Sequence, residues 1–344
     1  MMDGNETKSN TVPVVDFGPF LDGKGEDKQR VAKEIDNAFK TVGFVCLVNY
    51  GIKQEEVDKC FEWSRRFFDL PMESKMLAPH PPTAAHHRGY SGVGLEKASH
   101  SDFDEKPHEE LRQTPDVKES YEIGNEEDEM QPNIWIPEEV LPGFRDFMNA
   151  FFGSCTSLTG SILHSLALAL SLEPTRLSAA QSRALYQLRL LHYPSVPASL
   201  LRSGAATRIG AHADFGTLTL LFQDGVGGLE IERREGPDGA RTGEFVGVPA
   251  VPGGVLVNVG DLMERWSNGR WKSTVHRVGL PPTAGGEGGD EVVRDRYSIP
   301  FFSTADPETV IECLPGCSSE EDPPKYEPVT AWGYINMRMQ ALYS

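Results

Sequence analysis

Residues 209–221 read Ile-Gly-Ala-His-Ala-Asp-Phe-Gly-Thr-Leu-Thr-Leu-Leu, an apolar run with an imidazole and a carboxylate two positions apart. Its aliphatic and β-branched residues predict a strand. Side chains at positions i and i+2 of a strand point to the same side. We therefore expect His212 and Asp214 to direct a nitrogen and a carboxylate oxygen at one point, as two ligands of a metal ion would.

A third ligand is expected from a distant strand. His276 lies in residues 271–278, which read Trp-Lys-Ser-Thr-Val-His-Arg-Val and also predict a strand. Two histidines and one carboxylate form the facial triad of non-haem Fe(II) oxygenases, which leaves positions open on the metal. The spacing alone leaves another interpretation open, because a single histidine on a strand is more often a hydrogen-bonded core residue.

A second polar pair follows in residues 296–302, Arg-Tyr-Ser-Ile-Pro-Phe-Phe. Arg296 and Ser298 share one face of this predicted strand. A guanidinium binds a carboxylate with two parallel hydrogen bonds, and a hydroxyl can donate one more. The pair predicts a receptor for a dicarboxylate whose other end could chelate the metal. The apolar residues that follow argue against a surface arginine in an ordinary salt bridge.

Short strands separated by turn residues dominate the second half of the chain, a pattern typical of a sandwich, barrel or jelly roll. The pattern predicts strands at 12–17, 43–51, 185–193, 218–222, 228–231, 245–248, 255–259, 273–278 and 296–302. Helical spacing predicts helices at 27–41, 54–69, 144–172 and 330–343. Prolines and acidic runs predict long surface loops from His80 to Asn133, of the kind that form lids or pocket walls.

The net charge of −18, from 33 basic and 51 acidic residues, argues against nucleic acid and anionic membranes as partners. The chain shows neither a signal peptide nor a membrane span by its sequence pattern. Its five cysteines are an odd, scattered set, which predicts reduced thiols in the cytoplasm. The oligomeric state is open.

At this point the sequence resembles the Fe(II)/2-oxoglutarate-dependent dioxygenases of the isopenicillin N synthase-like family. The resemblance covers nearly the whole chain. The segments that carry it are residues 43–51, 212–221, 223–229, 257–261, 266–269, 272–278 and 296–298.

The resemblance implies a mainly β protein with α-helices. A double-stranded β-helix, or jelly-roll, core would span residues 181–310, after an N-terminal α/β region with helical support and pocket loops at 1–180 and before a C-terminal loop and helix at 311–344. It implies Fe(II) held by His212, Asp214 and His276, and 2-oxoglutarate and O2 as cosubstrates. The far carboxylate of 2-oxoglutarate would bind Arg296 and Ser298, and Tyr193 matches the family tyrosine that also touches it.

The implied function is hydroxylation, desaturation or cyclisation of a small organic molecule in specialised-metabolite biosynthesis. An alternative is an isopenicillin N synthase-like iron oxidase that does not use 2-oxoglutarate, because that enzyme keeps the Arg-x-Ser pair. A non-catalytic scaffold is disfavoured, because all three ligands are present. Phe215, Phe302 and residues 88–90 are candidate pocket walls. The other histidines are interpreted as loop or packing residues: His80, His86, His87, His100, His108, His164 and His192.

Overall fold

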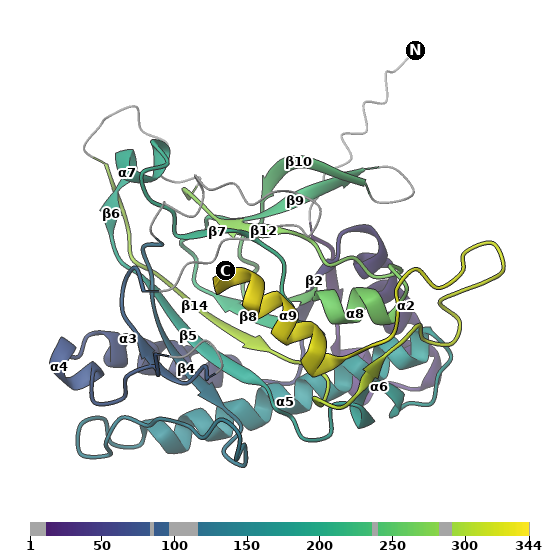
Figure 1. Cartoon of the computed structure of the whole chain (residues 1–344), viewed down its shortest axis with the longest axis horizontal. Helices are drawn as coiled ribbons and strands as arrows, with labels where there is room; N and C mark the ends of the chain where they lie inside the picture. The colour runs from purple at the N-terminus through teal and green to yellow at the C-terminus, as the bar shows by residue number, and fades with distance from the viewer. Residues whose placement is uncertain (1–11, 83–85, 96–115, 236–239, 282–290, 344) are drawn as a thin grey trace.

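The computed structural model describes residues 12–82, 86–95, 116–235, 240–281 and 291–343. Two sheets face each other (Figure 1). The major sheet has the order β1 (Val14–Asp16), β2 (Phe44–Val48), β11 (Val255–Val259), β8 (Leu218–Gln223), β14 (Arg296–Phe302), β5 (Gln187–Tyr193), β4 (Glu119–Gly124) and β3 (Gly89–Ser91). The minor sheet has the order β10 (Ala240–Gly247), β9 (Leu229–Glu235), β12 (His276–Val278) and β7 (Ile209–His212). This arrangement is the expected jelly roll.

Helices cover the outer face of the major sheet, and the long α5 (Phe144–Ala169) crosses it (Figure 1). The other helices are α1 (Gly18–Asp22), α2 (Gly25–Thr41), α3 (Gln54–Phe68), α4 (Met72–Lys75), α6 (Arg176–Ala179), α7 (Ala198–Arg202), α8 (Asp261–Trp266) and α9 (Ala331–Tyr343). Two short sheets pair β6 (Val196–Pro197) with β13 (Val292–Val293) and β15 (Val310–Ile311) with β16 (Val329–Thr330).

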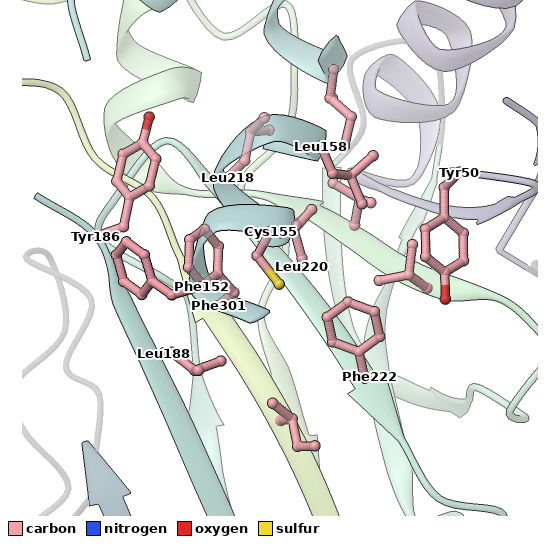
Figure 2. Packing of buried hydrophobic residues seen from close by; sticks show 14 of the residues in the cluster. Tyr50, Phe152, Cys155, Leu158, Tyr186, Leu188, Leu218, Leu220, Phe222 and Phe301 are labelled. Atoms are coloured by element: carbon pink, nitrogen blue, oxygen red, sulfur yellow. The ribbon is translucent and has the colours of Figure 1, made fainter. Parts of the chain in front are cut away.

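The strands of the major sheet have two different faces. On β8, Leu218, Leu220 and Phe222 are buried in the same cluster as Cys155 and Leu158 of α5, and Figure 2 shows this packing. Each such buried aliphatic or aromatic side chain contributes roughly 1.5–3 kcal/mol of hydrophobic stabilisation. The alternate residues of the strand point between the two sheets, where the cavity described below lies.

The strands predicted at 255–259 and 296–302 are confirmed at these bounds as β11 and β14. The prediction of surface loops from His80 to Asn133 is wrong where β3 and β4 complete the sheet. Because β4 contains several polar residues, its sequence lacks the apolar pattern of a buried strand. Its carboxylates are buried by ion pairs with residues elsewhere in the chain. The rest of that prediction, residues 83–85 and 96–115, lies outside the described residues.

Candidate active site

The three predicted ligands meet where the paired strands β7 and β12 of the minor sheet end. His212 ends β7 and pairs directly with His276, the first residue of β12. Asp214 follows two residues later, and its Oδ1 lies 4.0 Å from Nε2 of His212 and 3.9 Å from Nε2 of His276. These ligand atoms lie within 4.8 Å of one another, so the trio could hold one metal ion.

Backbone carbonyls fix which nitrogen of each imidazole faces the centre of the site. Nδ1 of His212 lies 2.9 Å from the carbonyl oxygen of Gly210, and Nδ1 of His276 lies 3.1 Å from that of Thr274. Because a carbonyl can only accept, each Nδ1 carries the proton and each Nε2 presents a lone pair. Burial, and after it the nearby His276, lowers the pKa of His212 to about 3, which keeps it neutral.

The carboxylate of Asp214 is held by two donors. Its Oδ2 accepts hydrogen bonds from Oγ1 of Thr219 at 2.6 Å and from Nδ2 of Asn258 at 2.7 Å. Burial raises the pKa of Asp214, but the two imidazoles and these donors outweigh burial and lower the pKa overall. Sequence reasoning assigned no role to Thr219 or Asn258, although both lie in segments that carry the family resemblance.

Close backbone approach positions the turn that bears Asp214. The amide of Asp261 donates to the carbonyl of Asp214 at 2.8 Å, and the amide of Thr217 donates to the carbonyl of Ser303 at 2.8 Å. A Cβ at Gly216 would collide with the carbonyl oxygen of Ser303. The glycine therefore allows the turn to lie against the end of β14.

Arg296 and Ser298 lie on the cavity face of β14, as expected, and both are almost fully buried. Nη1 of Arg296 donates to Oγ of Ser298 at 3.1 Å, and Nη2 donates to Oε1 of Gln223 at 3.3 Å. Within the described residues, Nε of Arg296 is buried with no hydrogen-bond partner. A buried guanidinium with an unsatisfied donor fits a carboxylate ligand.

Tyr193 pairs with Arg296 across β5 and β14, and the Arg296 guanidinium lies 5.0 Å from the centre of its ring. A second arginine, Arg208, approaches the same ring at 5.8 Å. Burial, followed by the positive charge of Arg296, lowers the pKa of Arg208 to about 10. The two guanidinium groups place positive charge beside Tyr193, and that of Arg296, which lines the cavity, suits an anion.

One cavity of about 870 Å³ joins these groups. It reaches from the predicted ligands to Arg296, and Phe215, Phe302, Arg88 and Tyr90 are among its lining residues, as expected for pocket walls. Sequence reasoning did not foresee that α9 would also line the cavity, through Trp332, Ile335 and Asn336. Figure 1 shows α9 across the region between the two sheets.

His80 and His87 also line the cavity, with Glu122 close to both. Their interpretation as loop or packing residues is therefore incomplete. This cluster could not be recognised from the sequence, because His80 and His87 come from an irregular segment and Glu122 comes from the unpredicted β4.

Among the helices of the described residues, none has the length and apolar character of a membrane-spanning segment.

Two family profiles match this chain. Residues 12–138 match the family described as the N-terminal region of non-haem dioxygenases in morphine synthesis, and residues 184–305 match the 2OG-Fe(II) oxygenase superfamily. The second match includes all six predicted site residues, which are His212, Asp214, His276, Arg296, Ser298 and Tyr193.

Similar proteins include the 2-oxoglutarate-dependent dioxygenase frbA of Dothideomycetidae sp. (strain 11243), 38% identical over 97% of this chain and 98% of that protein. The proline hydroxylase buaE of Petromyces alliaceus is 38% identical over 96% of this chain and 99% of its own length. The crystal structure of Neurospora crassa T7H with alpha-KG and thymine is 36% identical, covers 98% of each chain and has a TM-score of 0.84. The chain therefore belongs to the 2OG-Fe(II) oxygenase superfamily and is a 2-oxoglutarate-dependent dioxygenase that uses Fe(II).

Proposed function

We propose that His212, Asp214 and His276 hold the Fe(II) ion, and that Arg296 and Ser298 bind the far carboxylate of 2-oxoglutarate beside Tyr193. The observation that carries this proposal is the convergence of two Nε2 atoms and Oδ1 of Asp214 at one end of the cavity. The nitrogen and oxygen donor set suits Fe(II). The buried guanidinium of Arg296 suits an acidic cosubstrate.

Fe(II) bound with 2-oxoglutarate supplies the chemistry by which O2 oxidises a substrate C–H bond while 2-oxoglutarate is converted to succinate and CO2. The residues of this chain orient the reactants. The carbonyls of Gly210 and Thr274 aim the two imidazoles, while Thr219 and Asn258 aim Asp214. The apolar walls and α9 would exclude water from the reacting carbon.

The substrate proposed is a small organic molecule that is hydroxylated, desaturated or cyclised in specialised metabolism. A cavity of about 870 Å³ is within the range that small-molecule sites occupy. The similar T7H structure holds thymine, and buaE is named a proline hydroxylase. Both molecules are small, and the substrate of this chain would fall in the same general class. The comparisons do not favour an iron oxidase that works without 2-oxoglutarate.

The test is succinate release during a substrate screen, with product masses measured in parallel. Arg296→Ala should raise the 2-oxoglutarate concentration needed for turnover by about 10- to 100-fold, because it removes a charge-assisted contact worth about 1.5–3 kcal/mol. Arg183→Ala is the control, since Arg183 is an exposed arginine paired with Glu308. Substrate turnover without succinate would refute the proposal. Unchanged 2-oxoglutarate affinity in Arg296→Ala would refute the role of that residue.

We also propose a cytoplasmic location, which the five free cysteines support. Fractionation of cells that express the tagged chain tests it.

The division of the chain at residues 180 and 310 stays a prediction. Strands from both sides of residue 180 share the major sheet.

A further inference from the structure

A second group of polar side chains lies on the cavity wall, apart from the predicted iron and 2-oxoglutarate ligands. We call His80, His87, Glu122, Gln187 and Arg189 the polar cluster. Four of them line the cavity, and the side chain of Glu122 lies behind them with no exposed surface. Glu122 and Arg189 face each other across β4 and β5.

Glu122 holds its neighbours in fixed positions. Its Oε1 lies 2.5 Å from Nη2 of Arg189, and its Oε2 accepts a hydrogen bond from Nε2 of Gln187 at 2.6 Å. The same Oε2 lies 3.8 Å from Nδ1 of His87 and 4.0 Å from Nε2 of His80. The carboxylate therefore neutralises the charge of Arg189 and orients the amide of Gln187.

The hydrogen bonds define what the polar cluster offers to a ligand. Gln187 donates to Glu122 through its nitrogen, so its carbonyl oxygen is the acceptor on the other side of the amide. Nδ1 of His80 lies 2.6 Å from the carbonyl of Pro81 and must donate, while Nε2 of the same ring lies 4.0 Å from the carboxylate of Glu122. Arg189 can only donate, because a guanidinium has five N–H groups and no acceptor.

The charges of the polar cluster and of the neighbouring Arg88–Asp128 pair limit which class of ligand can bind. Arg189 is paired with Glu122, and the neighbouring Arg88 is paired with Asp128 at 3.0 Å. The net charge of each ion pair is zero. A carboxylate ligand would meet the buried charge of Glu122, and an ammonium ligand would meet Arg189, so either would be left without a matching charge. A neutral group with a carbonyl and an adjacent N–H matches both the donors and the acceptors.

The strand registers give the distance from the polar cluster to the reaction site. Gln187 pairs with Phe302, and Phe302 pairs with Thr219, whose hydroxyl binds Asp214. Gln187 thus lies two strands away from Thr219, which is roughly 10 Å. All three side chains line the cavity. An apolar spacer of a substrate would pack against Phe302 between the two points.

We propose that the polar cluster binds a neutral amide, lactam or imide group of the substrate and holds a C–H bond roughly 10 Å away at the iron site. This proposal rests on the proposed function, because the iron site defines where the reacting carbon lies. A metal ion at His80, His87 and Glu122 is disfavoured, although their ligand atoms lie close enough together. Such an ion would have to replace both Arg189 and Gln187 on the carboxylate.

The test uses three probes that differ only in their polar group: 3-phenylpropanamide, 3-phenylpropanoate and 3-phenylpropylamine. Their dissociation constants are measured by calorimetry on the full chain with Fe(II) and 2-oxoglutarate under anaerobic conditions. The wild type should prefer the amide to both charged probes by about tenfold or more. Glu122→Gln should shift preference toward the carboxylate by about tenfold, and Arg189→Gln should shift it toward the amine by a similar factor.

Glu308→Gln is the matched control for Glu122→Gln, because Glu308 is a carboxylate paired with an arginine but is 71% exposed. It should change none of the three constants. Equal binding of all three probes, or no binding of the amide, to the wild-type chain would overturn the proposal even if both cluster variants failed to fold. A second bound equivalent of Fe(II) or Zn²⁺ that disappears in His87→Ala would also overturn it.

The visible charge-transfer band of the Fe(II)–2-oxoglutarate complex separates this proposal from the proposed function. The band should persist in Glu122→Gln and Arg189→Gln, since neither residue is a proposed ligand of the iron or of 2-oxoglutarate. If the band forms but the preference among the probes does not shift, only the role of the polar cluster is wrong. If the wild-type chain forms no band, the proposed function itself is wrong.

Discussion

Replacing Thr219 by valine removes a single hydrogen bond from the carboxylate of Asp214 and leaves the side-chain shape nearly unchanged. Oγ1 of Thr219 donates to Oδ2 of Asp214 at 2.6 Å, and Asn258 donates to the same oxygen at 2.7 Å. A hydrogen bond to a charged group contributes about 1.5–3 kcal/mol. Thr219→Val should therefore lower the free energy of unfolding of the metal-free protein by about this amount.

The effect on Fe(II) affinity should be smaller than the full bond energy. The hydrogen bond exists before the metal binds, so its loss weakens affinity only through poorer orientation of Oδ1. In the variant, Asn258 still donates a hydrogen bond to Oδ2 of Asp214. Loss of one outer hydrogen bond at a metal ligand costs about 10- to 100-fold in affinity, and we expect the lower end, about tenfold.

Thr217→Val is the matched control. Thr217 is also fully buried, and its hydroxyl donates to Oε1 of Gln181 at 3.0 Å and lies 3.0 Å from Oγ of Ser303. Among the described residues its hydroxyl bonds to none of the predicted ligands, so this substitution should cost stability without changing metal affinity. Anaerobic Fe(II) titration measures the affinity, and thermal unfolding measures the stability. If the two variants bind Fe(II) within about twofold of each other, the reasoning about Thr219 is refuted.

Two further substitutions test the support around the site. Asp36→Asn should cost about 3–5 kcal/mol, because it leaves Arg270 without its carboxylate. Burial raises the pKa of Asp36, but donors led by Arg270 lower it overall. Its contribution is therefore complete above the unfolded pKa near 3.8 and is lost as the pH falls through the lower folded value, so urea unfolding of the variant should depend less on pH below about 4. Arg338→Met removes the 3.1 Å ion pair with Asp261 that ties α9 down. Faster hydrogen exchange in α9 and more succinate per product are expected, and unchanged values of both would contradict a covering role.

The convergence of His212, Asp214 and His276 could be predicted because much of it depends on local spacing. Alternation along a strand predicts that His212 and Asp214 share a direction. The strand predicted at 209–221 is wrong in its extent, because β7 ends at His212, Asp214 lies in the turn that follows, and β8 begins only at Leu218. The two side chains still converge, with Nε2 of His212 4.0 Å from Oδ1 of Asp214. His276 needed one more step, the pairing of β12 with β7, which the sequence does not encode by itself. The position of Arg296 and Ser298 on one face of β14 follows from the same alternation.

The polar cluster was not predictable for the opposite reason. Glu122 lies on a strand that is buried along its whole length, yet the sequence Glu-Ser-Tyr-Glu-Ile-Gly resembles an exposed segment. Its burial depends on Arg189, a residue of another strand. Hydrophobic patterning finds a strand whose buried face is apolar, and it fails where ion pairs satisfy the buried side chains.

Strand β5 connects the two polar ends of the cavity. Gln187, Arg189, Leu191 and Tyr193 alternate along it and all line the cavity. Tyr193 lies at the arginine-rich end and Gln187 lies six residues away, roughly 20 Å along the strand. Leu191 makes the middle of the strand apolar on its cavity side. A substrate group that packed against this middle would lose hydrogen bonds to water unless it were apolar. The strand therefore favours a substrate with an oxidisable hydrocarbon portion and a polar group at the Gln187 end, and the probe series tests which polar group that end accepts.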